Sequence, residues 1–144
     1  MIFVALLHAV NLGARRKVPM ADLRALLTGL GLEGVRTYIQ SGNAVFSADP
    51  ETDLRGRLEA ALEAQFGFPA LVTLRTAHAW REAARGCPAH LRDEAVVGQT
   101  LYQTVPDGVR TLNLSSGVLE RTLGVKVTVR NERTVQAIAA MLDT

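Results

Sequence analysis

The sequence is poor in several residue types, and each shortage excludes a class of protein. A single cysteine, Cys87, excludes an internal disulfide and a zinc site built on paired cysteines, which fits a reducing compartment. Aromatic residues make up only 5% of the chain, which argues against a stacking platform for RNA bases. No apolar run approaches about 18 residues, and the apolar opening has no basic leader, so we expect a cytoplasmic protein without a membrane partner.

Length and charge set further bounds. A chain of 144 residues with 48% hydrophobic content can bury one core or two small cores packed together. Sixteen basic residues stand against 14 acidic ones, so the net charge is only +2 and any anion-binding site must be local. We expect two subdomains, residues 1–75 and 76–144.

The first half has apolar patterns that alternate between strand and helix periods. Pro19 and Asp49-Pro50 are typical helix starts, and Gly31 and Gly67 are typical ends. The predicted strands are 2–7, 35–39, 44–47 and 71–75, and the predicted helices are 19–30 and 50–66. This strand, helix, strand, strand, helix, strand order is that of a ferredoxin-like α+β unit with an antiparallel sheet. It places the loop 11–17 and the turn 40–43 at the same end of the sheet.

The second half predicts a shortened α/β unit packed on the first. Thr76 is a candidate cap for a helix to about Arg85, and Asn131 for a final helix that turns Val135, Ile138 and Leu142 inward. Between these helices we expect strands at 100–105 and 125–130, a turn at 106–108 and a short helix at 118–123. Residues 87–97 show no convincing period.

A basic loop, "NLGARRKVPM", is the richest candidate site. Gly13 permits an unusual backbone, and Arg15, Arg16 and Lys17 place three positive charges before a helix start, which together make a candidate anion cradle. The spacing is neither that of a P-loop nor that of a dinucleotide-binding fingerprint. The alternative is a solvated charge run on the surface.

The turn "QSGN" is more polar than a tight hairpin requires. Gln40, Ser41 and Asn43 could exchange hydrogen bonds with a ligand held by the neighbouring basic loop, with Gly42 shaping the backbone. The alternative is an ordinary turn composition.

A third candidate lies near the C-terminus. Arg130 and Asn131 stand at a predicted strand-to-helix junction, which is a place where phosphate can bind. An exposed strand residue and a helix cap explain the same pair without a ligand.

Signals for catalysis are poor. His8, His78 and His90 are scattered without the spacing of a metal site, and no cofactor motif is present. Cys87 and His90 lie three residues apart, but no third group that would orient such a pair can be assigned. We therefore expect no metal and no cofactor, and we lean against an enzyme.

The segment 4–46, with "NLGARRKVPM" and "YIQSGNAVF", resembles a bacterial family known only as domain of unknown function 1697. The segments "YQTVPDGV" and "LERTLGVKVTVRNERTV" resemble its closing part. This resemblance implies an α+β protein with two ferredoxin-like halves and no established activity. The polar positions that match the family are Asn11, Gly13, Lys17, Gln40, Ser41, Gly42, Asn43, Arg130, Asn131 and Thr134.

The sequence departs from the family pattern in three places. His8 and Ala9 replace an Arg-Gly pair, and Thr111 and Asn113 replace basic residues after the Pro-Asp-Gly turn. A strand and helix that the family carries between Pro88 and Leu101 are not recognisable here.

The leading hypothesis is a protein that binds a phosphate-bearing small molecule or nucleotide at the basic and polar loops; a nucleic acid ligand is less favoured. A second hypothesis is an enzyme that acts on a phosphorylated metabolite, with His8 as proton carrier. A third is a homodimeric protein-interaction module that pairs through an open strand edge.

Overall fold

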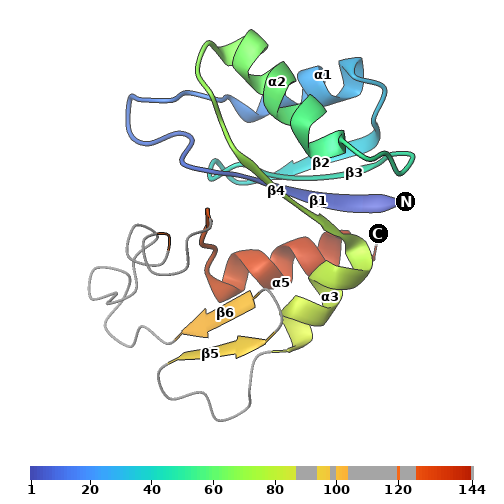
Figure 1. Ribbon diagram of the computed structural model, residues 1–144, viewed down its shortest axis with the longest axis vertical. Helices are drawn as coiled ribbons and strands as arrows, with labels where there is room; N and C mark the ends of the chain where they lie inside the picture. The colour runs from blue at the N-terminus through green and yellow to red at the C-terminus, as the bar shows by residue number, and fades with distance from the viewer. Residues whose placement is uncertain (87–93, 98–99, 104–119, 121–125, 144) are drawn as a thin grey trace.

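The computed structural model of the chain describes residues 1–86, 94–97, 100–103, 120 and 126–143. A four-stranded sheet forms the middle layer, with α1 and α2 on one face and α3 and α5 on the other (Figure 1). The elements are β1 (Ile2–Leu7), α1 (Met20–Gly29), β2 (Glu33–Tyr38), β3 (Asn43–Ser47), α2 (Leu54–Phe66), β4 (Val72–Thr76), α3 (Ala77–Arg85), β5 (Glu94–Val97), β6 (Thr100–Gln103) and α5 (Glu132–Met141).

The sheet has the strand order β2-β3-β1-β4, and each neighbouring pair is antiparallel. The element order from β1 to β4 and the antiparallel sheet confirm the α+β fold predicted from the sequence. β1 is central because its apolar run is covered on both faces: residues 3–7 are all buried. The division of the chain near residue 75 stays a prediction.

Two hydrophobic cores lie on opposite faces of β1. Phe3, Ala5 and Leu7 face α1 and α2, whereas Val4 and Leu6 face α3 and α5. The alternation follows from the two-residue period of a strand. A pair of helices therefore covers each face of the sheet, so a polar binding site is expected at the ends of the strands.

Both predicted helix caps in the second half are confirmed. The Thr76 hydroxyl accepts a hydrogen bond from the Ala79 N–H at 3.1 Å, and Asn131 Oδ1 accepts one from the Thr134 N–H at 2.9 Å. A cap of this kind stabilises a helix by about 1 kcal/mol. The caps fix where α3 and α5 begin and hence how they meet the sheet.

Three sequence predictions about element bounds are wrong. Helix α2 begins at Leu54 rather than Pro50, with Asp53 at its N-cap position. Residues 126–130 are not a strand, because this segment crosses the end of the sheet and bonds to it through side chains. Strand β5 was missed: it pairs with the predicted β6, with Ala95 opposite Tyr102, in a region without a recognisable sequence period.

Some sequence predictions fall outside the described residues. They are the turn at 106–108, Cys87 and His90, the replacements at Thr111 and Asn113, and all but residue 120 of the helix at 118–123. Within the described part of the chain, no helix has the length and apolar character needed to span a bilayer.

Candidate functional site

The predicted meeting of the basic loop and the polar turn is present at one end of the sheet. Asn11 Nδ2 donates to the Gln40 carbonyl at 2.7 Å and to the Val18 carbonyl at 2.9 Å. The Val18 N–H donates back to Asn11 Oδ1 at 2.9 Å. The Asn11 side chain therefore bonds to both the N–H and the carbonyl of Val18 within its own loop, and also to the turn at Gln40.

Gly42 explains why the turn has its composition. Its φ is 87°, and a Cβ at this position would lie 2.9 Å from both Leu7 Cβ and Val10 Cγ2. The Leu7 N–H donates to the Gly42 carbonyl at 2.8 Å, so the turn folds back against the end of β1. Only glycine combines this backbone conformation with so close an approach.

Asn43 anchors the other side of the turn. Its side chain is 1% exposed and donates to the Tyr38 carbonyl and to Ser41 Oγ, both at 2.8 Å. Asn43 Oδ1 in turn accepts from Arg130 Nε at 2.6 Å. Asn43 is therefore fully engaged inside the protein.

Arg130 reaches the turn from the opposite end of the chain. Its Nη2 donates to the Leu7 carbonyl at 2.8 Å and to the Ser41 carbonyl at 2.9 Å. Its Nη1 donates to Thr128 Oγ1 at 2.7 Å and to the Val129 carbonyl at 2.9 Å. With the bond to Asn43, all five N–H groups of the guanidinium have acceptors in the protein.

Burial lowers the pKa of the Arg130 guanidinium to about 10. All five of these acceptors are neutral oxygens, so the cation is held by dipoles and not by a carboxylate. The geometry gives Arg130 a structural role, because it closes the end of the sheet where β1 and the turn leave carbonyls unpaired.

The three basic residues of the loop divide into two kinds. Arg16 Nε donates to the Ala9 carbonyl at 2.6 Å, its Nη2 donates to the Pro69 carbonyl at 2.7 Å, and its guanidinium lies 4.6 Å from the centre of the Phe68 ring. Arg15 and Lys17 are exposed. Gly13 has a φ of 61° at the tip of the loop, with open space where a Cβ would stand.

Asn131 and Thr134 form the α5 cap already described. Thr134 is buried, with 4% exposure, and Asn131 is exposed. The structure thus brings Asn11, the turn and Arg130 into direct contact, while the site role predicted for them remains a prediction.

A cavity of about 390 Å³ lies beside this cluster, at the outer edge of β4. Its lining comes from the residue after β1, from α2, from β4 with the residue before it, and from the segment 126–131, and consists of His8, Arg55, Glu59, Leu71, Val72, Thr73 and Lys126. The volume falls in the range of small-molecule sites. The segment 126–131 runs from this cavity, at Lys126, to the polar turn, at Arg130.

His8 is the buried polar group of the cavity, with 9% exposure. Its Nε2 lies 2.7 Å from Thr73 Oγ1, and its backbone N–H donates to the Leu71 carbonyl at 2.9 Å. Burial lowers the pKa of His8, and the nearby positive charge of Arg130 lowers it further. The imidazole is therefore neutral at pH 7 and offers hydrogen bonds and not charge.

Two cations flank the cavity in loose, exposed ion pairs. Arg55 Nε lies 3.9 Å from Glu59 Oε1, and Lys126 Nζ lies 3.7 Å from Glu120 Oε2. The side chains of Arg55 and Lys126 are 69% and 68% exposed. Exposed pairs at such distances contribute little stability, so both cations are free to turn toward a ligand.

Glu59 is the acidic member of the lining, and one of its oxygens is already used. Its Oε2 accepts from the Val72 N–H at 3.0 Å, which satisfies an N–H on the open edge of β4. This contact fixes the carboxylate against the strand.

Sequence reasoning identified His8 but not the cavity around it. Arg55 and Glu59 lie one turn apart on α2, Thr73 lies on β4 and Lys126 lies in the segment 126–131. The packing of α2 against β4 and the course of the segment 126–131 bring them together, and no sequence motif joins them. The signal that was available is the position of His8 directly after the central strand, at the end of the sheet.

Known proteins resemble this chain in both sequence and fold. A family model described as "Protein of unknown function (DUF1697)" matches residues 1–122. A solved structure of a conserved bacterial protein from Streptococcus pneumoniae is similar, with a TM-score of 0.73, 24% sequence identity and 98% of each chain covered. No curated protein matches the chain significantly. At this identity the solved structure shows the fold alone.

Proposed function

Since the chain belongs to the DUF1697 family, described only as proteins of unknown function, we propose from the geometry that it binds a small phosphate-bearing molecule in the cavity beside His8. The observation that carries the proposal is the lining itself. Two exposed cations, Arg55 and Lys126, stand beside a buried, neutral imidazole in a cavity of small-molecule size.

The charged groups that can turn toward a ligand in the cavity are the two cations. Arg55 and Lys126 carry two positive charges on exposed side chains, whereas the two nearby carboxylates are held by backbone N–H groups: Glu59 by that of Val72 and Glu120 by that of Val127. A phosphate oxygen placed between the cations would receive charge-assisted hydrogen bonds, which are stronger than neutral ones. The exposed pairs with Glu59 and Glu120 are weak enough to be exchanged for such bonds.

The remaining lining suits the rest of a metabolite. The hydroxyl of Thr73 and the imidazole of His8 offer donors and acceptors, and Leu71, with 43% exposure, offers an apolar surface. A mixture of a few placed polar groups with an apolar wall is typical of small-molecule sites. Nucleotides and sugar phosphates both fit this description.

The predicted basic loop is the competing location for the same ligand. There, Arg16 and Arg130 have backbone and side-chain acceptors, so Arg15 and Lys17 are the cations that the loop presents to solvent. A comparison of Arg55→Gln/Lys126→Gln with Arg15→Gln/Lys17→Gln separates the two locations, because each double variant loses the same charge.

Isothermal titration calorimetry and thermal shift with AMP, glucose 6-phosphate and inorganic phosphate test the proposal. Because only the folded state binds, a ligand raises the unfolding midpoint. We expect binding of a phosphate compound that Arg55→Gln/Lys126→Gln weakens at least ten-fold and Arg15→Gln/Lys17→Gln leaves unchanged. If only Arg15→Gln/Lys17→Gln loses ligand binding, the site lies at the basic loop and not in the cavity. If the wild type binds none of these compounds, the proposal is refuted.

A second function is favoured by one observation, the neutral imidazole of His8 held against Thr73 inside the cavity. Such a group can accept a proton from a bound phosphorylated substrate or its attacking water. Release of inorganic phosphate from the same compounds, with a pH profile that His8→Gln abolishes, would support an enzyme. Turnover that survives His8→Gln would exclude this role for His8.

A further inference from the structure

One end of the sheet combines exposed apolar and basic side chains, a surface that we call the basic tip: Leu12, Arg15, Lys17 and Ile39. Leu12 is 55% exposed and Ile39 is 49% exposed. The segments 9–18 and 38–43 that form this tip contain no Asp or Glu. The Asn11 bond to the Gln40 carbonyl holds the two segments together.

Ile39 is unusual in its backbone as well as in its exposure. Its φ is 48°, a left-handed conformation that is costly for a β-branched residue. Half of the side chain is in solvent, so little packing within the monomer offsets this cost. A strained backbone that displays an apolar side chain points to a contact outside the monomer.

At the other end of the sheet the carboxylates outnumber the cations, and we call this surface the acidic tip: Ile2, Asp49, Glu51 and Asp53. The three acidic residues are exposed. Arg57 Nη1 lies 3.5 Å from Glu51 Oε1, whereas Asp49 and Asp53 form no ion pair with a described residue. Ile2 is 38% exposed. The Ala48 N–H donates to the Met1 carbonyl at 3.0 Å, and the N-terminal ammonium donates to the Ala48 carbonyl at 3.1 Å, which holds this loop beside the start of β1.

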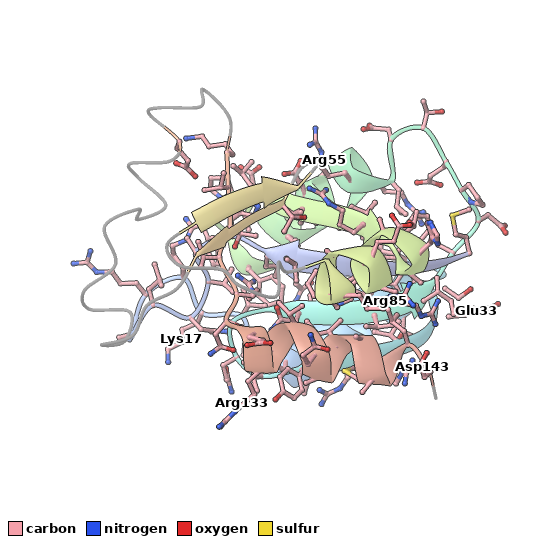
Figure 2. All side chains as sticks on the ribbon, turned by 90° about the horizontal axis from the view of Figure 1, so that it is seen from below. Lys17, Glu33, Arg55, Arg85, Arg133 and Asp143 are labelled. Carbon is pink, nitrogen blue, oxygen red and sulfur yellow. The ribbon has the colours of Figure 1, made fainter. Side chains whose placement is uncertain are left out.

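The tips lie at opposite ends of the same strands. Ile2 pairs with Ser47 at one end of the β1–β3 ladder, and Leu6 pairs with Asn43 at the other. In Figure 2, Lys17 projects at one end of the molecule and Glu33, which pairs with Ser47 at the start of β2, lies at the opposite end.

We propose that the chain associates head to tail with a second copy of itself, with the basic tip of one copy against the acidic tip of the next. Both tips expose aliphatic side chains, and their charges are complementary. A two-fold symmetric contact made by one tip alone would place like charges opposite each other, so an end-to-end contact between the two tips is heterologous and forms a ring or a filament. This inference is independent of the cavity, because none of its lining residues belongs to either tip.

Charge reversal tests the pairing. Arg15→Glu/Lys17→Glu makes both tips acidic, and Glu51→Lys/Asp53→Lys makes both tips basic. We expect the wild type to gain mass with concentration in light scattering at about 50 mM salt and to lose it at about 500 mM, because salt screens exposed charges. Each variant alone should stay monomeric, with at least a ten-fold weaker association.

An equimolar mixture of the two variants is the decisive sample. Each junction in the mixture again joins opposite charges, so we expect association to return to within a few-fold of the wild type. A mixture that stays monomeric, or a wild type that stays monomeric at every concentration, would overturn the proposal.

Matched controls separate the tips from general charge effects. Lys17→Glu should weaken association more than Arg85→Glu, which changes an exposed cation in the last turn of α3 by the same charge. Ile39→Asn should also weaken it, since it removes the apolar side chain from the basic tip. If circular dichroism shows that the charge-reversed variants are unfolded, the test uses Arg15→Gln/Lys17→Gln and Ile39→Asn instead. If both of these variants self-associate as strongly as the wild type does, the pairing is refuted.

Discussion

Replacing Arg130 by methionine measures how much one side chain stabilises the end of the sheet. The substitution keeps an unbranched apolar stem but removes every donor, so Asn43 Oδ1 and the Leu7 carbonyl lose their partner. Asn43 is 1% exposed, and water cannot replace the lost bond without a rearrangement. We therefore expect Arg130→Met to destabilise the fold.

The magnitude follows from two opposing terms. A buried acceptor left without a donor costs about 1–3 kcal/mol, so two of them cost about 2–6 kcal/mol. The pKa of about 10 means that burial already costs the Arg130 cation about 3 kcal/mol, which the variant regains. The difference between the two terms is a net loss of up to about 3 kcal/mol in the free energy of unfolding, with about 1 kcal/mol at the middle of the range.

Urea denaturation of Arg130→Met beside Arg133→Met is the assay. Arg133 is exposed in the first turn of α5 and projects from the helix in Figure 2, so its replacement should change stability by less than about 0.5 kcal/mol. Equal losses in the two variants would refute the structural role of Arg130.

Three further predictions concern neighbouring residues. The lowered pKa of His8 means that the unfolded chain binds more protons than the folded one as pH drops below about 6.5, so stability should fall there and level off once the pH is below the folded pKa. His8→Gln should flatten this dependence in urea denaturation at a series of pH values. Gly42→Ala should cost about 2 kcal/mol or more, since it adds a clash to a strained φ, whereas Gly31→Ala, with φ 90° in open space, should cost only about 1 kcal/mol; similar losses would exclude the clash. Ile39→Asn should raise the free energy of unfolding by about 0.5–1 kcal/mol by relieving the left-handed conformation, and a lower value would show that Ile39 packing matters in the monomer.

Local patterns predicted the first half of the fold well. The apolar run of β1 and the apolar faces of α1 and α2 indicate which side of each element is buried. The element order that follows from them predicted Asn11 beside the polar turn, and the hydrogen bond from Asn11 to the Gln40 carbonyl confirms this. Asn131 and Thr76 were recognisable because a cap acts on residues only three positions away. These are interactions between residues close in sequence.

Long-range contacts were not predictable in the same way. The alternation of residues 125–130 favoured a strand, yet Arg130 bonds to a turn 87 to 89 residues earlier, and no local period records that distance. The cavity is a similar case, since Lys126 reaches it from a segment remote from His8 and Arg55. The sequence therefore predicted which end of the sheet carries the polar and basic residues. It did not predict which of the cations there donate all their hydrogen bonds within the protein.

The Arg130 contact also has a consequence for the order of events during synthesis. Arg130, which donates to the Leu7 carbonyl, is synthesised 123 residues after Leu7. At the speed of the ribosome this is a delay of about 10 s. Until then β1 and β3 can pair, but the Leu7 and Ser41 carbonyls lack the donor that Arg130 supplies and are left to water. The nascent chain should therefore hold a hydrated, unsealed sheet end, and closing it is a late step of folding that depends on residues at the far end of the message.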